Sequence, residues 1–375
     1  MRAAALATIA AIAAPVMLLP APAVGWQQPA FAQALAPHPL VFPRDQGPHP
    51  DYRQEWWYLT GNLDAADGER FGFELTVFRF ALAPGETDTA ASSPQAGQEG
   101  SRWRARQIYL GHFAVTDVAR HRFRFVVKRA RGALGLAGAQ ADPFRAWVGN
   151  WQMGRNTLQA AGEGYALSLT TLPLSPPVLN GERGLSRKSG EPGNATYYYS
   201  IPRVAVQGTI VAEGRPLRVH GLAWLDREWG SGGLGPQEVG WDWFGLQLGD
   251  GSCLMFYFLR DRGGGEDPYS AGTWVDSAGH DRTLSRDDVH MQVLDYWTDA
   301  GGTRYPSRWR LVARTAGLNI TVRPVLADQE LVTSPRYWEG AVDVAGTDAG
   351  RPIAGRGYVE LVGYAGTAAG AVGIR

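Results

Sequence analysis

Short runs of strand-forming residues, separated by glycine-rich turns, constrain the fold of this chain more than any other feature. The runs alternate or cluster β-favouring side chains, as in residues 71–80, 165–170, 217–222, 309–313 and 358–362. The turns contain Gly with Asp, Ala or Ser, as in residues 64–68, 248–251 and 276–279. The chain contains 48 glycines, and hardly any mid-chain stretch keeps a helical period. The pattern predicts an all-β protein built from sandwiches or barrels.

Three segments interrupt this pattern and predict long loops. Residues 84–102 are polar and rich in Gly, Ser, Ala and Gln, so we expect a disordered insertion in a hairpin. Residues 172–193 contain four prolines and a basic cluster, and we expect them to cover a barrel mouth. Residues 262–272 predict a glycine-rich turn.

The first residues have the pattern of an export signal. Met1 and Arg2 precede an apolar run, residues 3–19, which proline interrupts at Pro15, and small-residue cleavage sites follow near Ala32. Such a run is too alanine-rich and too broken to be a convincing membrane span, and no later segment is apolar for long enough. We expect a periplasmic or secreted protein with no integral membrane span, and an uncleaved anchor is the alternative.

Length and charge constrain the organisation and the partners. Removing residues 1–32 leaves 375 − 32 = 343 residues, which suits two domains, each of roughly 150 to 200 residues. Each half has its own run of strands and its own Trp-rich beginning, so we place the domains at residues 33–229 and 230–375. The 36 basic and 36 acidic residues balance, which argues against nucleic acid as a partner.

The sequence lacks the motifs of several common catalytic classes. Cys253 is the only cysteine and lies in an apolar run, so we expect a buried, inert thiol and no disulfide. There is no G-x-S-x-G elbow, phosphate loop or H-E-x-x-H motif, and the seven histidines show no metal-ligand spacing. We therefore expect neither a metal nor a cofactor.

Acids and indoles concentrate between Gly221 and Gly245. Strand alternation places Trp224, Asp226 and Glu228 on one face and Arg227 with Trp229 on the other. In the next run, Asp242 shares a face with apolar residues, opposite Trp241 and Trp243. An acid in an apolar setting must be paired, hydrogen-bonded or protonated. Asp226, Arg227 and Glu228 could form a structural ion network or a catalytic group, and the residues alone leave both interpretations open.

Two further aromatic runs flank this cluster in the sequence. In residues 49–63, Glu55 and Trp57 alternate with Trp56 and Tyr58, as in a strand buried between two layers. Residues 197–199 are three consecutive tyrosines, of which Tyr198 faces opposite to its neighbours, so that one or more hydroxyls could reach a ligand.

Several motifs together resemble the AttH/carotenoid 1,2-hydratase (CrtC-like) family, in its secreted branch. The resemblance covers about residues 39–366. Its motifs are Glu55-Trp-Trp-Tyr58 with Thr60-Gly61, the Lys188 loop leading to Tyr197-Tyr-Tyr-Ser200, Ala223-Trp-Leu-Asp-Arg-Glu-Trp-Gly230, Gly240-Trp-Asp-Trp-Phe-Gly245, Trp338-Glu-Gly340 and Gly357-Tyr-Val-Glu-Leu-Val-Gly-Tyr364.

The resemblance implies two tandem lipocalin-like β-barrel domains. Related enzymes hydrate alkenes of carotenoids or prenylated phenols, which requires a carboxylic acid kept protonated in a dry pocket and indole faces that stabilise a cation. One position departs from the carotenoid hydratases: Arg227 stands where they have a histidine, and arginine cannot shuttle protons at neutral pH. The resemblance alone therefore does not assign the activity of the carotenoid hydratases to this chain.

We predict a cofactor-independent protein that binds an isoprenoid-like or polyene-like ligand near the domain junction, with acid-catalysed hydration or isomerisation as a further step. One alternative is a non-catalytic binding protein or chaperone that serves an envelope ABC transporter, and another is a secreted hydrolase. The predicted catalytic residues are Asp226, Arg227, Glu228 and Asp242. The predicted ligand-binding residues are Glu55, Trp57, Tyr198, Trp229, Trp241, Trp243 and Tyr257.

Overall fold

Strands account for nearly all regular structure in the computed structural model, which describes residues 30–85, 105–235 and 237–366. The exceptions in these ranges are the short 3-10 helices η1 (Arg44–Gln46), η2 (Arg286–Asp288) and η3 (Arg314–Ala316). The all-β prediction is confirmed. In the same ranges, no helix has the length and apolar character needed to cross a membrane.

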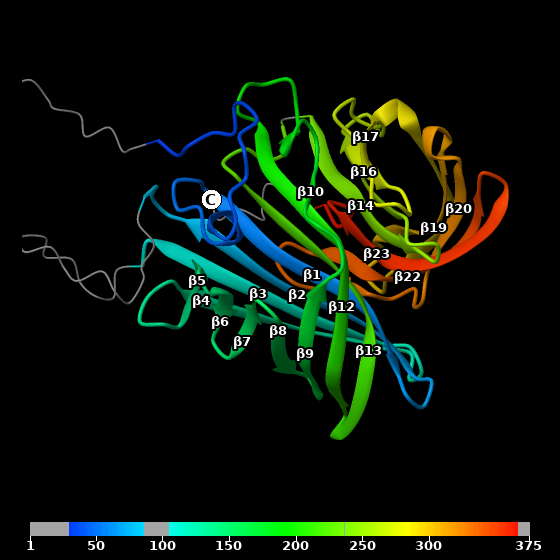
Figure 1. The fold of residues 1–375 in the computed structure, drawn as a ribbon, viewed down its shortest axis with the longest axis horizontal. Coiled ribbons are helices and arrows are strands. Elements are labelled where there is room, and N and C mark those ends of the chain that lie inside the picture. The colour runs from blue at the N-terminus through cyan, green and yellow to red at the C-terminus, as the bar shows by residue number, and fades with distance from the viewer. Residues whose placement is uncertain (1–29, 86–104, 236, 367–375) are drawn as a thin grey trace, which may run out of the picture. The chain divides into compact units, whose positions relative to one another are not determined.

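The first sheet contains every described strand up to Gly230, and its neighbouring strands are antiparallel (Figure 1). Its main path runs β4-β3-β2-β1-β13-β12-β9-β8-β7-β6-β5, and β10 and β11 pair with β12. The strands are β1 (Gln54–Ala65), β2 (Arg70–Ala81), β3 (Gln107–Asp117), β4 (Arg122–Arg131), β5 (Ala137–Ala141), β6 (Phe144–Val148), β7 (Trp151–Gly154), β8 (Thr157–Gly162), β9 (Tyr165–Pro173), β10 (Val178–Leu179), β11 (Leu185–Arg187), β12 (Ala195–Ala212) and β13 (Arg215–Gly230).

The second sheet begins after the connection that follows Gly230. Its path runs β17-β16-β15-β14-β23-β22-β20-β19-β18, with β21 paired to β22. The strands are β14 (Glu238–Leu248), β15 (Cys253–Asp261), β16 (Ala271–Val275), β17 (Asp281–Ser285), β18 (Val289–Thr298), β19 (Arg304–Ala313), β20 (Leu318–Pro324), β21 (Glu330–Leu331), β22 (Tyr337–Asp348) and β23 (Arg351–Val362).

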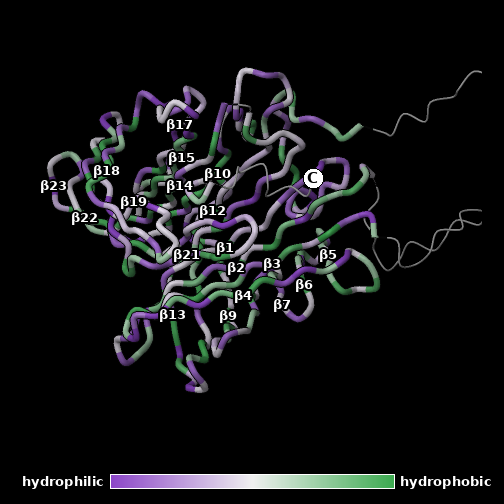
Figure 2. Tube along the Cα trace, turned by 180° about the vertical axis from the view of Figure 1, so that it is seen from behind, coloured by the Kyte–Doolittle hydropathy of each residue, from purple (hydrophilic) through white to green (hydrophobic). Residues whose placement is uncertain are grey.

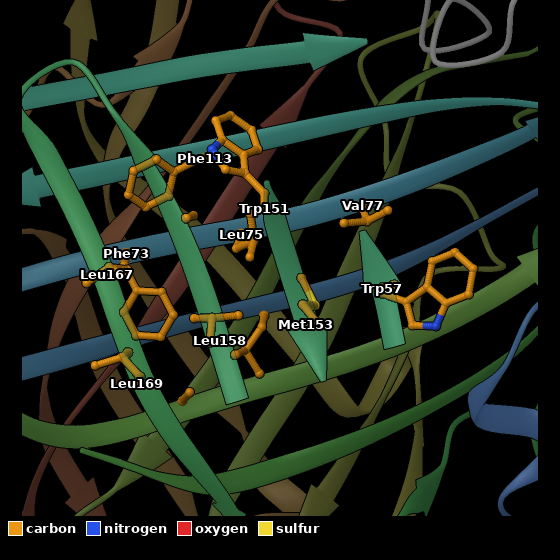
Figure 3. Close-up of a cluster of buried hydrophobic side chains, with 14 of the residues drawn as sticks. Trp57, Phe73, Leu75, Val77, Phe113, Trp151, Met153, Leu158, Leu167 and Leu169 are labelled. Carbon is orange, nitrogen blue, oxygen red and sulfur yellow. The ribbon is translucent and has the colours of Figure 1, made fainter. Parts of the chain in front are cut away.

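Each sheet curls around a hydrophobic core of its own. In the first sheet, the strands β5 to β8 fold back over β2 to β4, and Trp57, Phe113 and Trp151 are buried between them (Figure 3). In the second sheet, Phe244, Trp309 and Trp338 are buried in the corresponding place. Hydrophobic and hydrophilic residues vary along the strands (Figure 2), because alternate side chains face opposite sides of each sheet.

The outer faces of the two sheets pack against each other. A third hydrophobic cluster joins Tyr58, Tyr198 and Trp224 of the first sheet to Trp243 and Tyr257 of the second. Buried amides also cross between the sheets: Asn62 donates to the Gly357 carbonyl, and Gln247 donates to the carbonyls of Pro202 and Ala223. β1 and β13 are therefore covered on both faces, which explains why both faces carry aromatic residues.

Three sequence predictions can be compared directly with these strands. Residues 172–193 are less irregular than predicted, because they contain β10 and β11, and they lie beside β12. Residues 262–270 form the predicted turn between β15 and β16. Cys253 is buried, as expected, and burial raises the pKa of its thiol to about 11.

Two other predictions fall largely outside the described residues. The predicted export signal, residues 1–32, lies outside them except for its last three residues, and so does most of the predicted insertion, residues 84–102. The described residues from Phe31 onward form one compact unit, in which the chain passes from the first sheet to the second between Gly230 and Glu238. A division into two domains at this point stays a prediction.

Candidate functional site

A cavity of about 350 Å³ lies between the packed faces of the two sheets, and we call it the inter-sheet cavity. The first sheet contributes side chains from β1, β2, β3, β12 and β13, and the second from β14, β15, β22 and β23. Its wall is largely aromatic. The aromatic lining residues are Trp56, Tyr58, Phe78, His112, Tyr198, Trp241, Trp243, Tyr257 and Tyr337.

Asp226 is the carboxyl of the first-sheet wall. It accepts hydrogen bonds from the Tyr198 hydroxyl at 2.6 Å, the Ser200 hydroxyl at 2.5 Å and the Trp224 indole N–H at 2.7 Å. Burial raises the pKa of Asp226 to about 7, although the three donors favour the ionised form. Near neutral pH this carboxyl can therefore both donate and accept a proton.

Tyr198 links Asp226 to the second sheet. Its hydroxyl donates to Asp226 and accepts a hydrogen bond from the Trp243 indole N–H at 3.0 Å. Trp224 and Trp243 meet edge to face, with ring centroids 6.1 Å apart. The aromatic groups that hold Asp226 therefore come from both sheets, and the packing of the sheets fixes its orientation.

Glu228 lies two residues further along the same face and has a different partner. The Lys188 ammonium is 3.0 Å from its carboxylate, and the Thr196 hydroxyl also donates to it. Although burial opposes the charge, Glu228 raises the pKa of Lys188. The ammonium also lies over the Tyr257 ring, 4.3 Å from its centroid. Lys188 and Glu228 thus form a buried ion pair at the cavity wall.

The second-sheet wall carries two more buried carboxyls, Glu339 and Glu360, which face each other on the paired strands β22 and β23. Burial raises the pKa of Glu360 to about 8, although the Trp241 indole N–H donates to it at 2.8 Å. Burial and the charge of Glu74 hold the pKa of Glu339 well above its usual range. Burial therefore favours the protonated form of both groups.

Glu74, from β2 of the first sheet, lies close enough to Glu339 to affect its ionisation, and burial raises the pKa of Glu74 to about 7. The Thr76 hydroxyl donates to Glu74 at 2.8 Å. One oxygen of each acid, Glu74 Oε2 and Glu339 Oε1, has no hydrogen-bond partner within the described residues. Two neighbouring buried carboxyls do not readily ionise together, so their proximity favours a proton on one of them.

His112 lies beside this acid cluster but is not a base at neutral pH. Its Nδ1 is 2.6 Å from the Tyr337 hydroxyl, and burial lowers the pKa of His112 to about 3. A neutral imidazole can accept or donate a hydrogen bond without carrying charge. The cavity wall therefore combines buried acids whose pKa values are raised with a neutral imidazole ring.

Six of the predicted site residues line this cavity: Tyr198, Asp226, Glu228, Trp241, Trp243 and Tyr257. Their division by strand face follows the expected alternation, because Asp226 and Glu228 line the cavity and Arg227 does not. Their roles in catalysis or ligand binding stay predictions.

Arg227 and Glu55 lie on the other side of β13 and β1, inside the first sheet. Arg227 is 3.0 Å from the Glu55 carboxylate and also donates to the carbonyls of Gly47 and Trp56. Arg79 and His49 bind the same carboxylate. Although burial opposes it, these cationic and hydrogen-bonding partners hold the pKa of Glu55 well below its usual range. These contacts hold residues 47–52 against the first sheet.

Trp57, Trp229 and Asp242 are also placed away from the inter-sheet cavity. Trp57 and Trp229 belong to the first core, where the Arg227 guanidinium lies over both rings. Asp242 is bound by Arg260 at 3.0 Å and by the Tyr364 hydroxyl, and burial raises its pKa to about 6. The ion network considered for Asp226, Arg227 and Glu228 is not formed, because each has different partners.

Sequence reasoning did not select Glu74, Glu339, Glu360, His112 or Lys188 as site residues. Glu339, Glu360 and Lys188 do lie in motifs that carried the family resemblance, which was the available signal. Glu74 and His112 sit in ordinary-looking strands. Only the packing of one sheet on the other brings them to the acid cluster.

The comparisons with known proteins agree with this fold. The AttH-like family model matches residues 33–364. A crystal structure assigned to AttH, from Nitrosomonas europaea, is 32% identical with a TM-score of 0.76, and covers 89% of this chain and 100% of that one. Kievitone hydratase from Nectria haematococca shares the fold, with 15% identity, a TM-score of 0.64, and coverage of 90% and 98%.

A curated relative is also similar in sequence. The dehydratase asqC of Emericella nidulans is 22% identical over 216 residues, which are 55% of this chain and 60% of that protein. The match thus spans less than two thirds of the dehydratase. The family model covers most of the chain, and the AttH structure matches both curled sheets, so the predicted lipocalin-like fold is confirmed. This chain belongs to the AttH-like family.

Proposed function

We propose that this protein binds an apolar, alkene-containing molecule in the inter-sheet cavity and adds water to it or removes water from it. The observation that carries the proposal is Asp226, a buried carboxyl with a pKa of about 7 at the wall of an aromatic cavity. The names of two similar proteins, a hydratase and a dehydratase, support the same class of reaction. An isoprenoid or polyene-like ligand suits the apolar lining.

In the hydration direction, protonated Asp226 gives its proton to the less substituted alkene carbon. The π electron pair forms the new C–H bond, and a tertiary cation remains on the other carbon. Water attacks this cation and then loses a proton to the Asp226 carboxylate, which restores the acid. The sum is alkene plus water giving a tertiary alcohol, and dehydration is the reverse.

The surrounding groups suit the charges that this reaction creates. Trp241 and Trp243 line the same cavity, and an indole face turned toward the ligand would stabilise a cation. The Tyr198 hydroxyl and the Trp224 N–H bind the Asp226 carboxylate once it has lost its proton. On the opposite wall, burial raises the pKa of Glu360 to about 8, and its protonated form would add no negative charge that traps the cation as an ion pair.

The test is turnover in water enriched in ¹⁸O, with geraniol and geranylacetone as probes and mass spectrometry as the readout. By liquid-water volume, about 30 Å³ per non-hydrogen atom, a 350 Å³ cavity holds roughly 12 such atoms, the size of geraniol. We expect labelled alcohol from the wild type and a loss of at least 100-fold in Asp226→Asn. Asp242→Asn, a buried acid outside the cavity, is the control. Equal turnover in Asp226→Asn would refute the assigned role.

A binding protein without catalysis is the second candidate, and the apolar lining of the cavity favours it. It would hold the same class of ligand and could deliver it to a transporter of the cell envelope. Extraction of the purified protein with organic solvent, followed by mass spectrometry, would identify a co-purifying apolar molecule. If Asp226→Asn keeps that molecule and no probe is turned over by the wild type, binding alone is the function.

The hydrolase alternative has less support. A glycosidase places two carboxyls at an open, sugar-accommodating groove. Here Asp226, Glu228 and Glu339 are all buried, between 1% and 6% exposed, among aromatic rings. Export remains a proposal from residues 1–32, and cell fractionation of the full-length protein, with the size of the mature chain measured, would test it.

A further inference from the structure

Glu360 has more access to the inter-sheet cavity than the other carboxyls of its wall. Within the described residues, the other three carboxyls that line the cavity are between 1% and 6% exposed, whereas Glu360 is half-buried. Its neighbours on the same face of β23, Tyr358 and Val362, are both 2% exposed. The accessible surface of Glu360 therefore belongs to the cavity that it lines.

The two carboxyl oxygens of Glu360 have different surroundings. Oε2 accepts a hydrogen bond from the Trp241 indole N–H at 2.8 Å. Oε1 has no hydrogen-bond partner within the described residues, and unlike Glu339 Oε1 it is not buried. Oε1 can therefore form a hydrogen bond with a molecule in the cavity.

The groups around Glu360 favour its protonated form. Burial is the largest cause, and together with neighbouring negative charges it raises the pKa of Glu360 to about 8. Of the cations that line the cavity, Lys188 is paired with Glu228, and Arg53 is exposed. The titratable groups that act on Glu360 are acids and phenols: Tyr58 of β1, Glu74 of β2, Asp226 and Glu228 of β13, and Tyr337 and Glu339 of β22.

A protonated Glu360 selects the polar group of a ligand. Because Oε2 accepts from Trp241, the O–H is on Oε1, and its partner must be an acceptor. A carboxylate or phosphate would add a negative charge among acids. An ammonium group would oppose the cation that the proposed reaction forms on the same molecule. A carbonyl oxygen accepts the hydrogen bond and adds no charge.

We infer that Glu360 binds a carbonyl oxygen of the substrate, so that the molecule taken by the inter-sheet cavity is an alkene-containing ketone and not a hydrocarbon. This role of Glu360 rests on the proposed function, since it names the polar end of the molecule whose alkene Asp226 protonates. Glu360 belongs to the second sheet and Asp226 to the first. The two contacts together would give the substrate one orientation in the cavity.

The test is the binding of three molecules with one carbon skeleton, which are 6-methylhept-5-en-2-one, its alcohol 6-methylhept-5-en-2-ol and the hydrocarbon 2-methylhept-2-ene. All three are smaller than geraniol. In calorimetric titration at pH 6.5, we expect the wild type to bind the ketone at least tenfold more tightly than the hydrocarbon. Glu360→Leu should lose this preference. Asp242→Asn, at a buried acid outside the cavity, is the control and should keep the preference within twofold.

The pH dependence of binding tests the donor itself. Below its pKa of about 8, Glu360 donates to the ketone, and above it the carboxylate repels the carbonyl oxygen. The affinity of the wild type for the ketone should therefore fall at least fivefold between pH 6.5 and pH 9. Glu360→Gln keeps an N–H donor at both pH values, so its affinity should change less than twofold. The alcohol can donate to the ionised carboxylate, and its affinity should also change less than twofold.

Thermal unfolding of each variant establishes that it is folded. The role of Glu360 is overturned if the hydrocarbon binds as tightly as the ketone, if Glu360→Leu keeps the preference, or if Glu360→Gln keeps the pH dependence of the wild type. Titration of Asp226→Asn separates the two proposals. A ketone preference in this variant supports the role of Glu360 even if Asp226 is not the acid, and its absence from the wild type refutes that role even if Asp226→Asn loses turnover.

Discussion

Arg227 and Asp226 are adjacent in the chain, yet they belong to different parts of the molecule. The Arg227 guanidinium is on the inner face of β13 with Glu55, and the Asp226 carboxyl is on the outer face with Tyr198. An arginine that stays charged at every working pH is suited to a permanent ion pair, and it makes no contact with the inter-sheet cavity. The replacement of histidine by arginine at this position therefore does not remove an acid from that cavity.

Glu55→Gln should destabilise the protein strongly. The substitution removes the charge that two buried guanidinium groups share, and breaking such a buried pair costs about 3 to 5 kcal/mol. Urea unfolding followed by tryptophan fluorescence measures the change. Glu213→Gln, at the exposed pair with Arg122, is the matched control and should change stability by less than about 1 kcal/mol. A similar small change in both variants would contradict the assigned role of Glu55.

The alternation of faces in residues 222–230 and 241–248 could be predicted from the sequence, because a strand period of two fixes it. The hydrogen-bond or ion-pair partner of each acid could not be predicted from the sequence. Asp226 and Glu228 share one face, but only the pairing of β13 with β12, and the position of Lys188 after β11, give one a set of neutral donors and the other a cation. These pairings are between residues far apart in the chain.

At the scale of elements, β2 brings Glu74 to Glu339 and Glu360 on β22 and β23, which lie more than 260 residues further along the chain. The strands themselves are predictable, since each is an ordinary alternating run. The contact of β2 with β22 and β23 depends on how the second sheet packs on the first. No local sequence pattern in these strands predicts that packing. The motifs that contain Glu339 and Glu360 marked those residues, but they did not identify Glu74 as a neighbour.

The acid cluster predicts a loss of stability as pH rises through neutrality. The folded protein holds protons on Glu74 and Glu360 up to a pKa of about 7 and about 8, whereas an unfolded Glu releases its proton near a pKa of about 4.3. Between these limits unfolding releases protons, so this stability is complete below about pH 4.3 and is lost as pH rises to about 8. Asp226, whose pKa is about 7, contributes with the same sign.

Thermal unfolding between pH 5 and pH 9 measures this effect. We expect the melting temperature to fall over that range in the wild type, and Glu339→Gln to flatten the slope by removing one carboxyl of the contact. Glu182→Gln, an exposed acid, should leave the slope unchanged. A wild-type melting temperature that rises with pH, or an unaltered slope in Glu339→Gln, would show that the cluster does not hold its protons as described.

At the scale of the whole molecule, the contact between the sheets creates the inter-sheet cavity. A close approach at Gly72 is part of this contact: a Cβ there would lie 2.6 Å from the Ala341 Cβ and 2.9 Å from the Tyr358 hydroxyl. Only glycine allows β2 to approach β22 and β23 so closely. The two curled sheets were predictable from the strand pattern and the family resemblance. The faces through which the two sheets pack, and therefore the position of the cavity, were not predictable.

Gly72→Ala should therefore push the sheets apart locally. Overpacking of this kind costs about 1 to 3 kcal/mol, and we expect a loss of that order in the free energy of unfolding, together with weaker ligand binding in the inter-sheet cavity. Gly233→Ala is the control for stability alone, because a Cβ at that position meets no atom within 4 Å although Gly233 lines the cavity. Equal stability of the two variants would argue against a tight contact at Gly72.

Deuterium exchange into the alkene of geraniol, in D₂O at pD 7, tests whether Asp226 is the acid of the inter-sheet cavity. Reversible proton transfer from Asp226 would place deuterium on the alkene carbon even where little alcohol accumulates. We predict deuterium uptake by the wild type and by Asp242→Asn, and a loss of at least 100-fold in Asp226→Asn, with all three proteins folded. Uptake that is equal in Asp226→Asn and the wild type would contradict the claim that Asp226 is the acid of this cavity.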